Sequence, residues 1–105
     1  MQDRITQLFK AIADPTRRDI FHALVITSSA LSITQIANQF EISRQGVTKH
    51  IKTLEEAGLI YFDTKGRQRL CYANATPLKE LSKWIRHYEQ FWDDSLDGLG
   101  NYLDN

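Results

Sequence analysis

The amino-acid sequence predicts a mainly α-helical domain with one small β-hairpin. Three observations lead to this prediction: apolar residues recur at helical spacing along most of the chain, two serines begin short helices in close succession, and the spacing changes to that of strands after Gly58. With 105 residues and 42% hydrophobic side chains, the chain is expected to form a single domain, residues 1–105, with a modest core.

The first predicted helix covers residues 1–13, with apolar side chains at helical spacing: Ile5, Leu8, Phe9 and Ile12. A second helix is expected to begin immediately afterwards. Asp14 can cap it, and Pro15 suits the first helical position because its missing N–H donor has no helical partner there. Arg17 and Arg18 follow, and two roles stay open for them: contact with phosphate, or pairing with Asp14 or Asp19.

Residues 32–57 predict two helices joined by a very short turn. Ser32 with Gln35 three residues later forms a capping-box pattern, and Ser43 opens the next helix. Only Glu41 and Ile42 stand between these elements. Because so short a connection disfavours a long antiparallel hairpin, the two helices are expected to cross at a steep angle.

The second of these helices has two distinct faces. Val47, Ile51 and Leu54 form an apolar stripe at i, i+4 and i+7 spacing. The opposite arc is polar and contains side chains that suit base edges and phosphates: Arg44, Gln45, Thr48, Lys49 and Lys52. Gly46, unfavourable inside a helix, would allow close approach to a partner backbone. Taken alone, this face is equally consistent with an ordinary solvated helix surface.

Residues 59–73 predict a β-hairpin. Gly58 is expected to cap the preceding helix, and Gly66 supplies the positive φ that a hairpin turn favours. Apolar and other residues alternate in both strands: Ile60 and Phe62 with Tyr61 and Asp63, then Leu70 and Tyr72 with Arg69 and Cys71. The tip is basic and polar: Lys65, Arg67, Gln68 and Arg69. An isolated hairpin of this kind would be interpreted as a solubilising turn.

The order of these elements favours a winged helix-turn-helix that binds DNA, with one helix in the major groove and a charged wing on the backbone. The candidate DNA-binding residues are Ser43, Arg44, Gln45, Thr48, Lys49, Lys52, Lys65, Arg67, Gln68 and Arg69. The alternative is a winged-helix protein-interaction module that uses the same face.

The net charge of zero is segregated along the chain. Residues 44–69 carry six basic and three acidic side chains, a net +3, whereas residues 85–105 carry one basic and five acidic side chains, a net −4. Because salt screens exposed charges beyond about 8–10 Å, phosphate responds mainly to the local basic surface. The acidic end is therefore expected to point away from DNA.

The C-terminal segment predicts a helix over residues 77–103 with more large apolar side chains than one small domain can cover. Gly98 and Gly100 weaken its last turn. Packing of the terminal helices of two chains into a symmetric dimer would cover these side chains, although folding of the helix onto its own core is the alternative. The candidate interface residues are Ile5, Leu8, Phe9, Ile12, Trp84, Tyr88, Phe91, Trp92, Leu96 and Leu99.

The chain resembles the arsenical-resistance repressor (ArsR) family of small bacterial winged helix-turn-helix regulators. The resemblance is carried by residues 13–18 (Ala-Asp-Pro-Thr-Arg-Arg), 33–40, 43–60 and the wing to Tyr72, while Phe91-Trp92 is similar to members without metal sites. It implies a homodimeric repressor on a near-palindromic operator. The inducing signal, if one exists, cannot be inferred from the residues.

Metal, cofactor and catalytic sites are not expected. Cys71 is the single cysteine, and His87 is the only histidine near the C-terminal carboxylates. His22 is interpreted as lying beside the core, and His50 as packing rather than contacting a base. No phosphate-binding loop or nucleophile motif is present, and no signal peptide or membrane-spanning run is recognised, so a cytoplasmic, non-enzymatic protein is expected.

Overall fold

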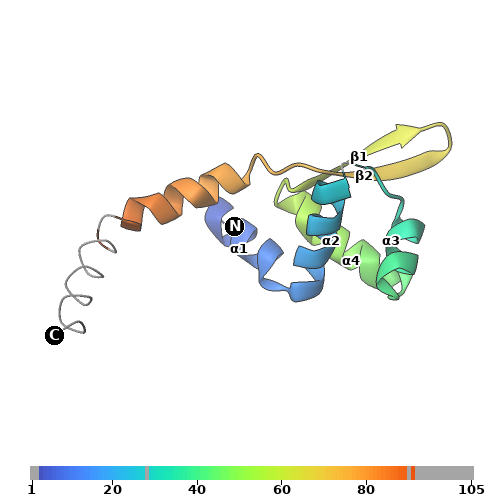
Figure 1. The fold of residues 1–105 in the computed structure, drawn as a ribbon, viewed down its shortest axis with the longest axis horizontal. Helices are drawn as coiled ribbons and strands as arrows, with labels where there is room; N and C mark the ends of the chain where they lie inside the picture. The colour runs from blue at the N-terminus through green and yellow to red at the C-terminus, as the bar shows by residue number, and fades with distance from the viewer. Residues whose placement is uncertain (1–2, 28, 90, 92–105) are drawn as a thin grey trace.

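The structure, a computed structural model, describes residues 3–27, 29–89 and 91. Its elements are α1 (Arg4–Ala13), α2 (Pro15–Thr27), α3 (Ile33–Phe40), α4 (Arg44–Glu56), β1 (Ile60–Lys65) and β2 (Gln68–Ala73), followed by a helix over residues 78–89. The hairpin extends from one end of the helical bundle, and the C-terminal helix leaves from the other (Figure 1). This architecture confirms the predicted winged helix-turn-helix.

The junction of α1 and α2 follows the predicted capping pattern. Pro15 begins α2, and the Asp14 carboxylate accepts a hydrogen bond of 2.9 Å from the Arg17 backbone N–H. This bond favours the charged carboxylate and so lowers the pKa of Asp14 below its ordinary value. Asp3 caps α1 in the same way, accepting from the Thr6 N–H at 2.8 Å, which likewise lowers the pKa of Asp3.

Two caps and a left-handed residue produce the turn between α3 and α4. At Ser32 the capping box is complete: the Ser32 hydroxyl accepts from the Gln35 N–H at 3.2 Å, and the Gln35 side chain accepts from the Ser32 N–H at 2.8 Å. Ser43 caps α4 by accepting from the Gly46 N–H at 3.0 Å. Glu41 has a φ of 55°, so the chain leaves α3 through the left-handed conformation and enters α4 after two further residues.

The core lies between α4, the two N-terminal helices and the base of the hairpin. The stripe of Val47, Ile51 and Leu54 is at most 1% exposed, as its spacing predicts. The other buried members are Leu8, Ala11, Ile20, Leu24, Ile36, Ala37, Ala57, Leu59, Ile60, Cys71 and Leu81. Leu8 is wholly inside this core, so it has no surface to offer a partner chain and we omit it from the proposed interface. None of the helices in the described ranges has the length and composition to cross a membrane.

Gly58 ends α4 and turns the chain into the hairpin. Its φ is +77°, the Gly58 N–H donates to Glu55 O, and the Leu59 N–H donates to Leu54 O, both at 2.9 Å. This pair of bonds is the Schellman arrangement, with glycine in the left-handed position just after the helix cap. The predicted role of Gly58 is therefore confirmed, and the turn sends Leu59 and Ile60 directly into the core.

The hairpin has a two-residue turn at Gly66 and Arg67, which pairs Lys65 with Gln68. Gly66 has a φ of +63°, as a tight hairpin turn requires. The register that follows places Phe62 opposite Cys71 and Tyr61 opposite Tyr72.

The alternation predicted for the second strand, with Leu70 and Tyr72 as its apolar set, differs from the burial in the structure. Cys71 is the fully buried residue of β2, and Leu70 and Tyr72 are half-buried on the other face, where Tyr72 stacks on Tyr61 at 5.2 Å between ring centroids. Cys71 is buried because it is paired on both sides. It lies opposite Phe62 of β1, and its backbone also exchanges hydrogen bonds with Leu31, which draws Cys71 toward the interior.

We expect Gly58→Ala to destabilise the fold by about 1–2 kcal/mol, because an L side chain is strained in the left-handed conformation. A Cβ atom there would also lie 3.0 Å from Arg4 Nη2. Urea denaturation measures the change. Gly46→Ala is the control: it removes a helix-weakening glycine, and the added Cβ would meet only the Ser43 hydroxyl at 3.2 Å. Equal loss in both variants would contradict the assigned turn.

Burial raises the pKa of the Cys71 thiol to about 11. At neutral pH the thiol is therefore protonated and enclosed, and the reactive thiolate is scarce. We expect Cys71 to react with a thiol reagent such as DTNB only as fast as the chain unfolds, with full reaction in denaturant. Rapid labelling of the native protein would contradict this placement.

Candidate nucleic-acid interface

The outward face of α4 carries the predicted reading side chains. Arg44, Gln45, Thr48, Lys49 and Lys52 are all exposed, and the first four line a single shallow hollow. The burial of Val47, Ile51 and Leu54 on the opposite side sets this orientation. The structure therefore places one polar, cationic helix face toward solvent.

Two hydroxyl groups of this set are already engaged inside the helix. The Ser43 hydroxyl accepts the capping bond from Gly46, and the Thr48 hydroxyl donates to the Arg44 carbonyl oxygen at 2.7 Å. The donor of Thr48 is thus used within α4, which leaves its methyl group as a contact that suits a thymine methyl. Gln45 and Lys49 have no such internal bonds among the hydrogen bonds of the described residues and can direct their polar groups outward.

The wing carries four predicted residues, which the structure divides into two positions. Lys65, Arg67 and Gln68 lie at or beside the turn, at the exposed tip. Arg69 lies further back, with its guanidinium carbon 3.7 Å from the centroid of the Phe62 ring. This cation–π contact holds Arg69 on the side of the hairpin that faces α4.

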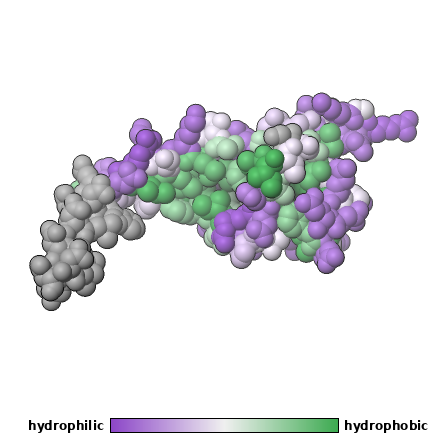
Figure 2. All heavy atoms as spheres, in the orientation of Figure 1, coloured by the Kyte–Doolittle hydropathy of each residue, from purple (hydrophilic) through white to green (hydrophobic). Residues whose placement is uncertain are grey.

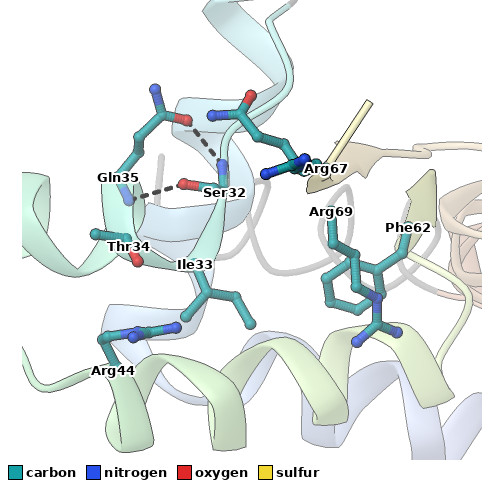
Figure 3. A pocket seen from close by; sticks show the side chains of 9 residues that line it. Ser32, Ile33, Thr34, Gln35, Arg44, Phe62, Arg67 and Arg69 are labelled. Atoms are coloured by element: carbon teal, nitrogen blue, oxygen red, sulfur yellow. Dashed lines mark hydrogen bonds between the residues drawn. The ribbon is translucent and has the colours of Figure 1, made fainter. Parts of the chain in front are cut away.

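A groove of about 600 Å³ joins the helix-turn-helix to the wing (Figure 3). It is lined by Ser32, Ile33, Thr34, Gln35, Arg44, Phe62, Arg67, Gln68 and Arg69. Three arginines, from α4, the hairpin turn and β2, thus meet at one hollow (Figure 3). No carboxylate lines this groove, so its charge is positive.

Sequence reasoning missed the first turn of α3 as part of this surface. Thr34 and Gln35 are exposed and line the groove. The capping box at Ser32 was the available signal, because it fixes where α3 begins. It could not show which way that beginning faces, since this depends on how the hairpin folds back beside it.

The side chains of Arg17 and Arg18 form no ion pair with Asp14 or Asp19 among the described residues, and both bind backbone carbonyl groups instead. The Arg17 guanidinium donates to the carbonyl oxygens of Ala11 (2.8 Å) and Lys10 (2.7 Å). Arg18 donates to the carbonyl oxygens of Ile12 (2.6 Å) and Ala13 (3.2 Å). Both arginines therefore cap the C-terminal end of α1, where backbone acceptors have no helical donor.

A second surface lies where the C-terminal helix leaves the bundle (Figure 2). Phe9 of α1 meets Trp84 edge to face at 5.3 Å, and Trp84 contacts Tyr88 at 5.1 Å. Large apolar side chains here are 40–59% exposed: Phe9, Trp84, Ile85, Tyr88 and Phe91. Ile5 and Ile12 are half-buried against the core, and Trp92, Leu96 and Leu99 lie outside the described residues.

The described residues contain no group of three or more His, Cys, Asp or Glu side chains that would hold a metal ion. His22 is exposed on α2, which corrects its interpretation as a residue beside the core. His50 is half-buried and contacts Arg17, whereas the ring of His87 packs edge to face on Tyr88.

Comparison with known proteins agrees with this geometry. A family model described as a helix-turn-helix domain matches residues 12–60. The chain is 40% identical over 84 residues to the uncharacterised HTH-type transcriptional regulator YuzN of Bacillus subtilis (strain 168), covering 74% of this chain and 91% of that one. It is 30% identical over 92 residues to the transcriptional repressor SdpR of the same organism, covering 88% and 100%.

A solved structure shares most of this architecture. The crystal structure of an ArsR family transcriptional regulator superimposes with a TM-score of 0.74 at 28% identity, covering 86% of this chain and 91% of that chain. Fold, surface and relatives together define a DNA-binding transcriptional regulator of the helix-turn-helix class. Within that class, the chain belongs to the ArsR-like family of winged helix-turn-helix regulators.

Proposed function

We propose that the protein is a homodimeric repressor that places its two α4 helices in consecutive major grooves of a near-palindromic operator, with the wings on the flanking backbone. The observation that carries the proposal is the joining of the exposed α4 face, the first turn of α3 and the wing arginines around one cationic groove. A helix face of this kind matches the width of a major groove. The naming of one relative as a transcriptional repressor supports the direction of regulation.

The contacts divide by position and chemistry. Gln45 and Lys49, exposed on the middle of the reading face, suit adenine and guanine edges. Lys65 and Arg67 at the wing tip suit phosphates, which carry no sequence information. The remaining proposed contacts surround these two groups: Ser43, Arg44, Thr48, Lys52, Gln68 and Arg69.

The dimer is proposed from the exposed aromatic surface of α1 and the C-terminal helix. Trp84 contacts both Phe9 and Tyr88 within the chain, yet all three side chains keep two-fifths or more of their surface exposed. Aromatic side chains dominate the energetics of interfaces, and a two-fold interface places the same patch against itself. This surface lies at the opposite end of the molecule from the wing (Figure 1), so pairing would leave both reading faces free.

Charge reversal of the reading face should abolish operator binding. We expect Lys49→Glu to eliminate binding to a duplex selected by the wild-type protein, measured by fluorescence anisotropy, while the dimer persists. Lys79→Glu reverses a charge that is also exposed, on the C-terminal helix, and should bind normally. The wild-type affinity should fall steeply between about 50 and 200 mM salt because phosphate contacts release counterions. Weak binding at every salt would favour a protein-interaction module instead.

Charge placed in the aromatic surface should separate the protomers. We expect Tyr88→Glu to produce a monomer in sedimentation experiments and to lose operator binding with it, because an unpaired carboxylate is unfavourable in an apolar interface. Ile26→Glu is the matched control, since Ile26 is 64% exposed on α2, away from this surface. A dimeric Tyr88→Glu protein, or a monomeric Ile26→Glu protein, would place the interface elsewhere.

A further inference from the structure

Arg17 stands where α1, α2 and α4 meet. It belongs to the first turn of α2, and its guanidinium uses a different nitrogen for each of three neighbours. Nε donates to Ala11 O at 2.8 Å, Nη2 donates to Lys10 O at 2.7 Å, and Nη1 lies 3.5 Å from His50 Nδ1. Its own backbone N–H donates to the Asp14 carboxylate at 2.9 Å. Arg17 is thereby held from four directions.

These contacts direct the Arg17 side chain toward the C-terminal end of α1. Both carbonyl acceptors belong to the last turn of α1, so the cation stabilises the negative end of that helix. The planar guanidinium is held by two short bonds to the backbone, which fixes its orientation toward His50. A side chain committed in this way is not free to follow a phosphate.

His50 is the residue of α4 that receives this contact. It is half-buried, next in sequence to Lys49 on the reading face and to Ile51 in the core stripe. For Arg17 to donate to Nδ1, the ring must be neutral with its proton on Nε2. The carboxylate of Asp14, which accepts from the Arg17 backbone N–H, carries the opposite charge beside Arg17.

We propose that Arg17 is a positioning residue for DNA recognition, which fixes the reading helix α4 to the end of α1 through His50. α1 carries Phe9 of the proposed dimer surface. The junction at Arg17 therefore sets the orientation of each reading helix relative to the reading helix of the partner protomer. The inference rests on the proposed dimeric DNA binding. Its physical content is pre-organisation: a fixed helix loses less freedom when it enters the groove.

The test compares Arg17→Lys, His50→Ala and their double variant with the wild-type protein. A lysine retains the charge but cannot hold two carbonyl groups and an imidazole at once. Arg18→Lys is the matched control, because Arg18 caps the same helix end through Ile12 and Ala13 and forms no hydrogen bond with α4 among the described residues. Binding to a duplex selected by the wild-type protein is titrated over a range of salt concentrations, and sedimentation reports the dimer.

We expect Arg17→Lys and His50→Ala each to weaken binding about tenfold, and the double variant to be no weaker than either single one, because one shared link is lost. The salt slope and the dimer should stay as in the wild-type protein, Arg18→Lys should bind normally, and ring ¹⁵N NMR of His50 should show Nδ1 without a proton. His50→Ala tests the link even if Arg17→Lys fails to fold.

A reduced salt slope in Arg17→Lys would overturn the inference, because it would mean that Arg17 contacts phosphate directly. Unchanged affinity, additive losses in the double variant, or an equal loss in Arg18→Lys would overturn it as well. Failure of the proposed function looks different: the wild-type protein itself would select no duplex.

Discussion

The burial of one side of α4 is the constraint on which the rest of the structure depends. Val47, Ile51 and Leu54 are enclosed by the core, so the opposite face of the helix must point to solvent. That face carries only polar and basic side chains between Arg44 and Lys52. Because burial of each large apolar side chain contributes about 1.5–3 kcal/mol, rotating α4 to hide its cations would be strongly unfavourable. The reading surface is therefore a consequence of the core.

The two ends of α4 determine where the neighbouring elements, α3 and the hairpin, lie. At its start, the Ser43 cap and the left-handed Glu41 bring α3 close, so that Thr34 and Gln35 join the groove. At its end, Gly58 directs the chain at once into β1, and the hairpin returns Arg67 and Arg69 to the same groove. Local backbone geometry at both ends thus assembles a composite cationic surface from three segments.

Much of this was predictable because it depends on local bonds. The caps at Asp14 and Ser32 and the left-handed turn at Gly58 each involve residues within a few positions of one another, and the sequence displays them directly. The inward position of Cys71 and the contact between Arg17 and His50 were not predictable in this way. Both depend on segments brought together by folding: Leu31 pairs with Cys71, and His50 reaches Arg17 across 33 positions.

The central claim is that two reading helices are held at the spacing of successive major grooves. A spin label at Gln45→Cys tests it most directly, because Cys71 is buried and Gln45 lies exposed on α4. Pulsed electron–electron double resonance of the free dimer should give a distribution of distances between the two labels centred near one helical turn of DNA, about 34–36 Å. The absence of dipolar coupling, or a sharp separation far from one turn of DNA, would contradict the account.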